Sequence, residues 1–427
     1  MRVLLISANT ELINMPVLPL GTAYIAAAAD AAGHEVRMLD LMAQDKDIRI
    51  ILEEAVRDFS PRVIGISVRN IDDQCMENTK FLLEPVKAIV AACRSLSDVP
   101  IVLGGPGYSI FPKSALAYLK ADMGIQGEGE KSFVMLLERL EQQADISDIP
   151  GLWLPEIGLR EKVCRSKDMD DFPSPLPNIH LSLPPALKDD EIWIPFQTRR
   201  GCPMNCSYCS TASIEGRIMR SHSPQRAVES LRGYVSAGFS HFFFVDNTFN
   251  FPAGYAEELC ERIIAEGLNI SWRCILYPHK TAERLIGKMA KAGCKEVSMG
   301  CESGSEQILR QMNKRFSIED VRRISGLLKQ HGIHQMGFLL LGGPGETRET
   351  AEQSLCFIES LEPEAVKVSR GIRIYPYTAL SRIAVREGRI ASDEDLLFPE
   401  FYMAQGLKDW LKKTVSDRAA GRPNWII

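Results

Sequence analysis

Residues 192–209 read IWIPFQTRRGCPMNCSYC, an apolar run that passes directly into a loop with three cysteines. We interpret Ile192–Thr198 as a β-strand and the cysteines as the loop at its carboxyl end. Five further strand patterns follow, at His241–Asp246, Ser271–Ile275, Glu296–Gly300, Gln335–Leu341 and Ala365–Ile374. Helical patterns separate them, at Pro224–Ala237, Ala253–Glu266, Ala282–Ala292, Ile318–Gln330 and Arg348–Leu361. Six β/α units in a row predict a partial parallel (β/α)6 barrel over residues 191–376, with its chemistry at the strand ends.

The N-terminal third alternates in the same way. Short apolar runs predict strands at Val3–Ser7, Glu35–Asp40, Val63–Val68, Ile101–Gly104 and Met123–Gln126. Helices are expected at Thr22–Ala32, Ile48–Asp58, Glu77–Arg94, Lys113–Lys120 and Lys131–Gln142. Residues 1–145 therefore predict a doubly wound, Rossmann-like α/β domain with a five-stranded parallel sheet. Residues 146–190 are rich in proline and read as a linker with room for a small hairpin. Residues 377–427 read as a helical C-terminal extension.

Composition excludes several classes of protein. The net charge is −5 and no strongly basic stretch occurs, so a broad nucleic-acid surface is not expected. The N-terminus lacks the pattern of a secretory signal, and the longest apolar stretch is too short for a membrane span. These features, with an odd number of cysteines (11), predict a reduced cytoplasmic protein and not a disulfide scaffold. Eight of the cysteines are scattered singly among apolar residues and are expected to be buried.

The other three, Cys202, Cys206 and Cys209, sit within eight residues. Zinc normally takes four closed ligands from two separated pairs, and no second pair or nearby His is present. Three thiolates on a four-iron cube leave one iron open to a substrate, so we predict an iron–sulfur cluster. Gly201 lets the backbone approach such a cluster, and Arg199 and Arg200 can offset its charge. A zinc site and a chance group of thiols are the alternatives.

The C-x3-C-x2-C spacing with an aromatic before the last cysteine resembles the radical S-adenosylmethionine (radical SAM) superfamily. The resemblance implies that Cys202, Cys206 and Cys209 ligate a [4Fe–4S] cluster whose open iron binds SAM. It also implies that SAM contacts come from residues at the strand ends: Tyr208, Asp246, Asn247, Glu302, Ser303, Gly342, Gly343, Pro344 and Tyr375. Each of these short motifs is weak alone, since Gly-Pro-Gly is usually only a turn. Their order along one barrel-like segment makes the set specific.

Two glycine-bearing turns and one Ser-containing turn also end three of the N-terminal strands. From the residues alone, they are equally well read as tight β/α turns or as room for a large planar cofactor. No G-x-G-x-x-G follows the first strand, which argues against a dinucleotide. Next to a radical SAM barrel, the arrangement resembles the cobalamin-binding domain of cobalamin-dependent radical SAM enzymes. The cobalamin contacts implied are Ser67, Arg69, Gly104, Gly105, Pro106, Gly107, Tyr108, Gly127, Glu128 and Gly129.

One departure concerns cobalt. Many cobalamin domains carry D-x-H-x-x-G after the first strand, but residues 8–21 contain no His. The nearest, His34, is expected to be a surface turn residue. We therefore expect cobalt without a protein His ligand. Arg69 either lies beneath the metal, where a guanidinium cannot donate a lone pair, or forms a surface salt bridge.

The resemblance implies methylation of an unactivated carbon. One SAM supplies a methyl group to cobalamin, and a second gives a 5′-deoxyadenosyl radical that abstracts hydrogen from the substrate. An external donor of the flavodoxin or ferredoxin type is expected to supply electrons. The substrate stays unassigned among small molecules, lipids, peptides and proteins. The alternatives are a cobalamin-dependent cyclase or ring-rearranging oxidase, a methylthiotransferase, which needs a second cysteine triad, and a non-catalytic cobalamin sensor.

Overall fold

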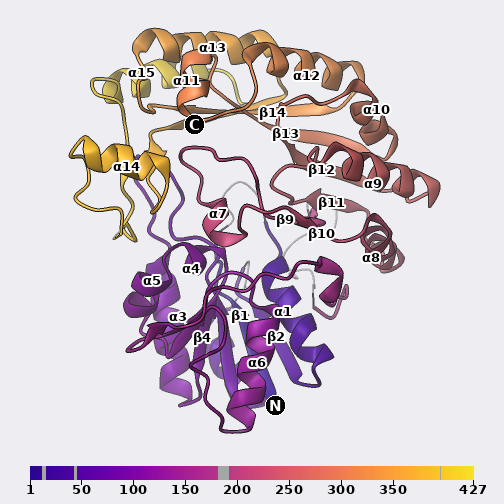
Figure 1. Ribbon diagram of the computed structural model, residues 1–427, viewed down its shortest axis with the longest axis vertical. Helices are drawn as coiled ribbons and strands as arrows, with labels where there is room; N and C mark the ends of the chain where they lie inside the picture. The colour runs from indigo at the N-terminus through magenta and orange to yellow at the C-terminus, as the bar shows by residue number, and fades with distance from the viewer. Residues whose placement is uncertain (12–15, 43–45, 181–191, 395) are drawn as a thin grey trace. The chain divides into compact units, whose positions relative to one another are not determined.

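The computed structural model describes residues 1–11, 16–42, 46–180, 192–394 and 396–427. The chain divides into two compact units, which are taken one at a time below (Figure 1). The first unit comprises Met1–Asp73, Lys80–Ile194 and Ser213–Glu215, and the second comprises Gln74–Thr79, Pro195–Ala212 and Gly216–Ile427. The described part of the predicted linker, up to residue 180, belongs to the first unit; residues 181–190 lie outside the described ranges.

The first unit is built on a sheet with the strand order β2-β1-β3-β4-β5-β6-β7. Its strands are β1 (Arg2–Ser7), β2 (Glu35–Asp40), β3 (Val63–Ser67), β4 (Ile101–Gly104), β5 (Met123–Ile125), β6 (Leu152–Leu154) and β7 (Gly158–Leu159). Strands β1 to β5 are parallel, which confirms the doubly wound sheet predicted from the apolar runs. The proline-rich segment extends this sheet, because β6 and β7 form an antiparallel hairpin that pairs with β5.

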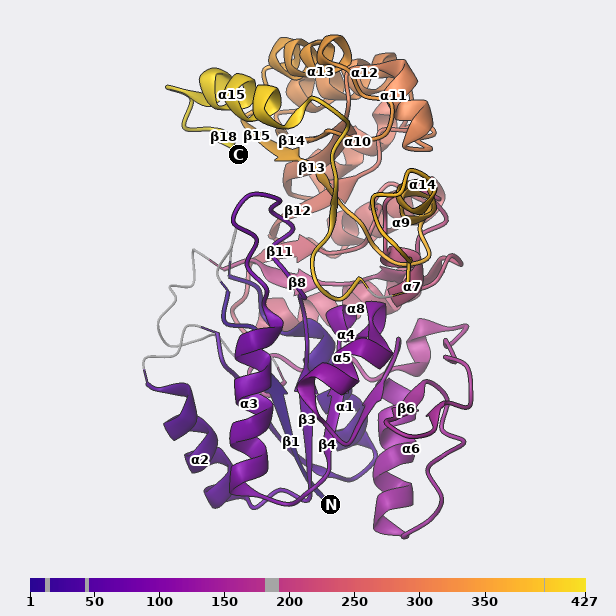
Figure 2. The same cartoon turned by 90° about the vertical axis from the view of Figure 1, so that its left-hand side faces the viewer.

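Helices cover both faces of the first sheet. They are α1 (Leu20–Ala31), α2 (Ile48–Phe59), α3 (Leu83–Leu96), α4 (Pro106–Ile110), α5 (Pro112–Leu119) and α6 (Glu130–Glu141), and a short 3₁₀ turn, η1, spans Met169–Asp171. Helix α2 packs beside α3, and α1 packs beside α6 on the opposite face (Figure 2). The predicted helix at Glu77–Arg94 begins only at Leu83, because Gln74–Thr79 belongs to the second unit.

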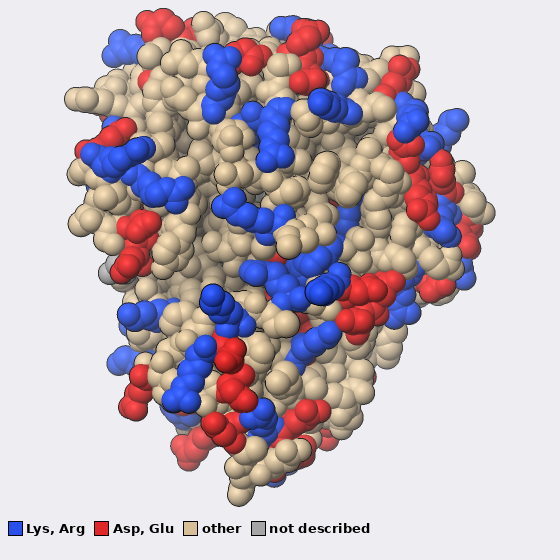
Figure 3. All heavy atoms as spheres, in the orientation of Figure 1, with Lys and Arg blue, Asp and Glu red and all other residues tan. Residues whose placement is uncertain are grey.

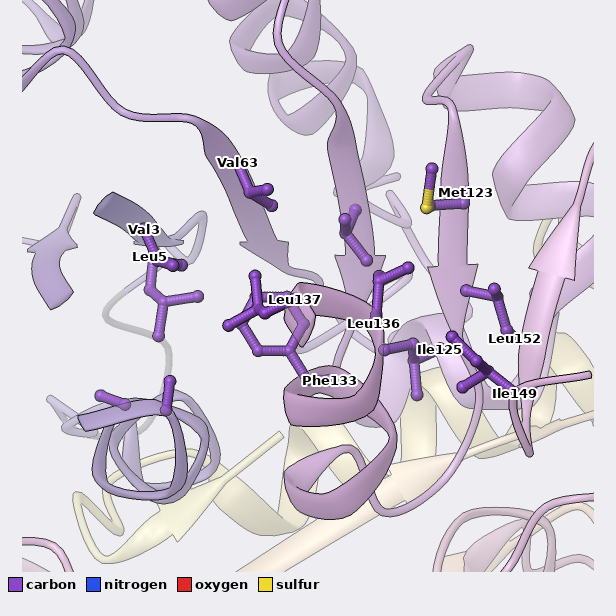
Figure 4. Packing of buried hydrophobic residues seen from close by; sticks show 13 residues of the cluster. Val3, Leu5, Val63, Met123, Ile125, Phe133, Leu136, Leu137, Ile149 and Leu152 are labelled. Carbon is purple, nitrogen blue, oxygen red and sulfur yellow. The ribbon is translucent and has the colours of Figure 1, made fainter. Parts of the chain in front are cut away.

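The core between α6, α1 and the sheet is apolar throughout. Phe133, Leu136 and Leu137 of α6 point at the strands and are almost fully buried (Figure 4). They meet Val3 and Leu5 of β1 and the apolar side chains of the neighbouring strands. Burying one such side chain contributes about 1.5–3 kcal/mol, so this layer holds the sheet and its turns in place.

The second unit contains another sheet, with the order β18-β15-β14-β13-β12-β11-β8. Its strands are β8 (Ile194–Phe196), β11 (His241–Phe244), β12 (Ser271–Leu276), β13 (Cys294–Glu302), β14 (His334–Leu341), β15 (Ala365–Arg370) and β18 (Trp425–Ile426). The first six of these are the predicted barrel strands, and neighbours from β11 to β15 pair in parallel. The C-terminal β18 adds a seventh strand beside β15.

Helices follow the strands of the second sheet along one side (Figure 1). They are α8 (Pro224–Ser236), α9 (Ala253–Ala265), α10 (Glu283–Lys291), α11 (Glu306–Gln311), α12 (Ile318–Gln330) and α13 (Arg348–Leu361). A Cβ on Gly337 of β14 would meet Ile358 of α13, so this face of the strand lies against the helices. Because side chains alternate along a strand, Met336 and Phe338 point to the opposite, inner face.

The C-terminal extension is only partly helical. Beyond α14 (Ala379–Arg386) and α15 (Lys408–Ala419) it contains β17 (Phe401–Tyr402), which pairs with β16 (Ile372–Arg373), and the edge strand β18. The extension was predicted as helical because two-residue strands leave no detectable period in the sequence.

Two surface properties agree with the sequence. Acidic and basic side chains are interspersed over much of the face drawn in Figure 3, as expected for a net charge of −5. In the described ranges, no helix is long and apolar enough to cross a membrane.

Packing at Gly124 of β5 gives a test of the first unit. A Cβ at this position would overlap the buried Tyr108 ring, so we expect Gly124→Ala to destabilise the fold by about 1–3 kcal/mol through overpacking. Gly21→Ala in α1 is the matched control, since nothing lies within 4 Å of its Cβ position. Urea unfolding of both variants decides the point: equal midpoints would contradict the packing described here.

Candidate functional site

The cysteine loop begins at β9 (Arg199–Arg200) in the second unit, where Gly201 has φ +90°. A Cβ on Gly201 would overlap the carbonyl of Ile218, near the paired strand β10 (Arg220–Ser221), so only glycine fits. Cys202 and Cys206 are half-buried and Cys209 is exposed. The eleven cysteines all lie within the described ranges, and none forms a disulfide. The three loop thiols are thus available as ligands.

Backbone hydrogen bonds hold this loop against two other segments. Ser207 N donates to Met312 O at 3.0 Å, after α11, and Leu380 N of α14 donates to Ser207 O at 2.8 Å. Among the described residues, no three thiol, imidazole or carboxylate groups lie at metal-ligand spacing. The cluster therefore stays a prediction, supported by the cysteine spacing and by the anchored loop.

Asp246, at the end of β11, fixes the start of the loop. Its Oδ1 accepts hydrogen bonds from the backbone N–H groups of Thr198 (2.7 Å) and Arg199 (2.9 Å). Its Oδ2 accepts from Thr198 Oγ1 and from the Arg199 guanidinium, at 2.8 Å for Nη2. Both side chains of the ion pair are 1% exposed. Asp246 was expected to contact SAM, but its oxygens are used within the protein, and we infer a positioning role instead.

Tyr208 lies in a buried polar group beside the loop. Its hydroxyl donates to Glu302 Oε1 at 2.8 Å and accepts from Lys314 Nζ at 2.9 Å. Lys314 also forms an ion pair with Glu302 at 2.8 Å. Burial raises the pKa of Tyr208 well above its usual value, and the Glu302 charge adds to the rise. Burial would lower the pKa of Lys314, but Glu302 and Tyr208 outweigh it and hold the ammonium charged.

Ser303 was expected beside SAM but faces away from the strand ends. It is fully buried, and its hydroxyl lies 2.9 Å from that of Ser354 in α13. Ser354 Oγ also accepts from Gly304 N, which ties the turn after β13 to the helix layer. We therefore infer a structural role for Ser303.

The glycine-rich turn follows β14. Gly342 has φ +94° and accepts a hydrogen bond from Ala404 N at 2.8 Å. Glu346 closes the turn: its Oε2 accepts from the N–H groups of Gly342 and Gly343, and its side chain is buried. Burial raises the pKa of Glu346 to about 7, although those two hydrogen bonds lower it. Pro344, between the glycines and Glu346, is half-buried.

The remaining two SAM predictions, Asn247 and Tyr375, are half-buried side chains beyond β11 and β16. The Arg373 guanidinium lies 5.2 Å from the centroid of the Tyr375 ring. The contacts of Asn247 and Tyr375 within the protein do not identify a ligand. Their contacts with SAM therefore stay predictions.

In the first unit, the predicted cobalamin residues gather at the carboxyl ends of β3, β4 and β5. Val68 N donates to Gly104 O at 2.8 Å, and Gly107 N donates to Val68 O at 3.0 Å, so the turns after β3 and β4 lie side by side. A Cβ on Gly105 would meet Val68 O and Ser67 Oγ, and one on Gly107 would meet Arg69 O. Pro106 begins α4 at its first position. Protein packing thus explains these glycines without a ligand.

The third turn, after β5, is built similarly. Gly127 has φ +83°, and a Cβ there would meet Val163, while one on Gly129 would meet Ile25. Glu128 Oε2 accepts a hydrogen bond from Ser166 N at 3.3 Å. Glu128 is therefore engaged with the proline-rich segment.

Two residues of this edge differ in accessibility. Tyr108 is fully buried and its ring fills the space above Gly124, so its side chain packs in the core, and its contact with cobalamin stays a prediction. Its hydroxyl finds no hydrogen-bond partner among the described residues. Arg69 is exposed and forms no ion pair with any described residue, so both of its expected roles stay predictions.

No imidazole lies at this edge of the first sheet. His34 precedes β2 and so lies at the opposite, amino-terminal edge. It was expected to be exposed but is buried, with Nδ1 3.1 Å from the N-terminal ammonium. The other His of this unit, His180, pairs with Asp30 at the end of α1. The expected absence of a His ligand to cobalt stays a prediction.

Sequence reasoning missed Thr198, Lys314 and Glu346, because no fixed spacing marks them. It also expected all eight scattered cysteines to be buried. Five of them are buried, whereas Cys75, Cys164 and Cys356 are exposed.

The Arg199–Asp246 pair predicts a large effect on stability. Asp246→Asn leaves the buried guanidinium without its carboxylate, which should cost about 3–5 kcal/mol of unfolding free energy. Glu266→Gln is the matched control, because its pair with Arg232 is exposed and worth about 0–1 kcal/mol. Urea unfolding and iron content after reconstitution measure both effects. Equal losses in the two variants would refute the positioning role.

Glu346 predicts a pH dependence. Its pKa is about 7 in the folded chain against an ordinary 4.5, so the folded state keeps a proton that the unfolded chain releases. Stability from this group is complete below about pH 4.5 and falls by roughly 3 kcal/mol as the pH rises to 7. Glu346→Gln should abolish that loss, whereas Glu349→Gln, an exposed neighbour, should not. Parallel urea titrations at pH 5 and pH 7.5 test this.

Comparison with known proteins matches two separate segments of the chain. The sequence pattern of the B12 binding domain matches residues 7–137, and that of the radical SAM superfamily matches residues 197–358. An uncharacterized methyltransferase of Pyrococcus horikoshii is 28% identical, over 90% of this chain and 83% of the relative. The tryptophan 2-C-methyltransferase of Streptomyces laurentii is 23% identical, over 88% of this chain and 73% of the relative.

The fold agrees with that of a solved relative. The structure of the radical SAM methyltransferase TsrM from Kitasatospora setae, with cobalamin and a [4Fe-4S] cluster bound, matches with a TM-score of 0.86. The match covers 100% of this chain and 90% of that chain, at 21% identity. The fold class expected from the sequence is thereby confirmed. The chain thus combines a segment similar to the B12 binding domain with a later segment similar to the radical SAM superfamily.

Proposed function

We propose that this enzyme transfers a methyl group from SAM to an unactivated carbon, with cobalamin as the intermediate carrier. The observation that carries the proposal is the loop of Cys202, Cys206 and Cys209: three free thiols on one anchored loop are one ligand short of a four-iron cube. When bound, the cluster supplies the electron that cleaves SAM, and cobalamin supplies the methyl group in transferable form. The work of the protein is then to position these groups and to exclude water.

The second unit offers the residues for the cluster and SAM. Asp246 and Arg199 set the entry of the cysteine loop, and the Glu302–Lys314 pair orients Tyr208 next to it. The glycine-rich turn at Gly342–Pro344, held by Glu346, presents backbone groups at the end of β14. We assign SAM binding to the strand-end residues of the barrel segment 191–376, namely Tyr208, Asn247, Glu302, Gly342, Gly343, Pro344 and Tyr375.

The first unit offers an edge of backbone turns that suits cobalamin without an imidazole ligand. Ser67, Gly104–Gly107 and Gly127–Gly129 form that edge, and Arg69 is exposed at it. A guanidinium cannot donate a lone pair to cobalt. If Arg69 lay below the metal, that side of cobalt would therefore have no ligand. We assign cobalamin binding to residues 1–145 and treat residues 146–190 as the linker. We assign to residues 377–427 the role of covering the end of the barrel.

Electrons must come from outside the chain, and we infer a flavodoxin or ferredoxin type of donor. A cytoplasmic location fits this inference, because none of the eleven cysteines, all in the described ranges, forms a disulfide and because a cluster needs reducing surroundings.

Methyl transfer is tested with reconstituted enzyme and methyl-labelled SAM under anaerobic conditions. We expect label in the product and release of both S-adenosylhomocysteine and 5′-deoxyadenosine. Cys206→Ser should remove both, whereas Cys356→Ser, an exposed cysteine on α13, should leave both unchanged. A product of altered structure without the label would favour a cyclase or oxidase. The proposal would be refuted if no candidate substrate gave either a labelled product or S-adenosylhomocysteine.

The cobalt environment is tested by EPR of the cobalt(II) form. The wild-type enzyme should show no nitrogen splitting from a protein imidazole. Arg69→His should introduce such splitting if residue 69 lies below the metal, and Arg62→His, at the opposite edge before β3, should not. Imidazole splitting in the wild type would refute the His-free assignment, and its absence in Arg69→His would refute the placement of Arg69.

A further inference from the structure

One side of the cysteine loop lies against the segment that leads into β10. Cys202 N donates a hydrogen bond to Gly216 O at 3.1 Å. The next two side chains, Arg217 and Ile218, are exposed, Ile218 to 77%. The carbonyl of Ile218 lies close to the position that a Cβ on Gly201 would take, so this backbone is packed although its side chain faces water. A basic and an apolar side chain are thus presented at the surface beside the first cysteine.

The other side of the loop lies against the turn after α11. The Arg315 guanidinium donates to Pro203 O at 3.4 Å, and the Asn313 amide donates to Asn205 O. Asn205, Asn313 and Arg315 are exposed. The residues between the first two cysteines therefore reach the surface between two segments that are far apart in sequence.

The segments that meet here are basic, although the chain as a whole is acidic. They contain seven Lys and Arg and no Asp or Glu, over residues 199–209, 216–223 and 310–318. Three of the seven, Arg217, Arg310 and Arg315, are exposed, and these three form no ion pair with any described residue. Because the net charge of the chain is −5, an acidic protein is repelled by the chain as a whole and attracted to this region.

These side chains have the composition of a protein–protein contact. The surface combines apolar groups with exposed arginines, and we define it by Pro203, Met204, Asn205, Arg217, Ile218, Arg310, Asn313 and Arg315. Transient interfaces likewise join apolar groups to a charged rim. Exposed side chains contribute little to folding stability, so binding explains Arg217 and Ile218 better than folding does.

We propose that this surface is the docking site of the external electron donor, and that the donor is a small acidic one-electron carrier protein. The inference rests on the proposed function, because it takes the cysteine loop as the site of the cluster that receives the electron. The donor is oxidised by one electron as the cluster is reduced by one, and no atom changes place. Electron transfer slows steeply with distance, so the donor must lie against this loop, and the exposed charges guide it there. Electron-transfer partners need only a small contact.

The first test measures the affinity of the full-length reconstituted protein for an oxidised bacterial flavodoxin of acidic composition. Calorimetry at about 50 mM and about 300 mM salt should show a dissociation constant that rises at least about tenfold, since salt screens exposed charges. At the lower salt, Arg217→Glu/Arg315→Glu should bind at least about tenfold more weakly, whereas Arg217→Lys/Arg315→Lys should stay near the wild-type affinity. Lys413→Glu, an exposed charge reversal on α15, is the matched control and should change nothing.

The second test follows cluster reduction by absorbance. Reduced flavodoxin should reduce the cluster at least about tenfold more slowly in Arg217→Glu/Arg315→Glu. Sodium dithionite, a small reductant that needs no docking surface, should reduce it at the wild-type rate. Ile218→Ser should weaken flavodoxin binding by the same factor at both salt concentrations, because it removes an apolar contact and no charge.

Unchanged affinity and rate in Arg217→Glu/Arg315→Glu would overturn the inference. An equal loss in Lys413→Glu, or slower reduction by dithionite, would overturn it too, because these results indicate overall charge or damage to the loop. Tighter binding of single-stranded RNA than of flavodoxin would overturn it in favour of a nucleic-acid surface. If the double variant takes up no cluster, the affinity of Ile218→Ser and the salt dependence of the wild type decide. A wild-type protein that takes up no cluster would instead refute the proposed function.

Discussion

The second unit depends on one buried ion pair, between Arg199 and Asp246. Two fully buried charges are costly unless each is paired and hydrogen-bonded, and here Asp246 accepts from the backbone and side chains of Thr198 and Arg199. The pair joins the start of the cysteine loop to the end of a neighbouring strand. The guanidinium also donates to Phe251 O at 3.1 Å, so Arg199 is anchored directly before Gly201 and the cysteine loop. The positions of the cluster cysteines follow from that constraint.

Around this pair, the site is assembled from chain segments that are far apart in sequence. The cysteine loop is hydrogen-bonded to Met312, after α11, and to Leu380 of α14. Glu302 reaches the loop through Tyr208, and Lys314 closes the group. These contacts join loops and helix ends that lie beyond the strands. Parallel strands bring such loops together at one edge of the sheet. The same principle brings the turns after β3, β4 and β5 to one edge of the first sheet.

Several polar residues near these strand ends make their contacts within the fold. Ser303 binds α13, and Tyr108 fills the space above Gly124. The glycines after β4 are required by the carbonyl groups of the neighbouring turn. Motif position alone does not separate such residues from ligand contacts, because both lie on the same short turns. Burial and the number of hydrogen bonds already made within the protein do separate them.

The sequence by itself determined the two parallel sheets, since buried parallel strands are apolar throughout and alternate with amphipathic helices. It also determined the three cysteines, whose spacing is local. Tertiary structure decided the rest. Strands β6, β7 and β18 are too short to show a period. The hydrogen bonds of Asp246 to Thr198, and of Lys314 to Tyr208, connect residues more than forty positions apart. No local pattern encodes such contacts, because they depend on which strands become neighbours when the chain folds.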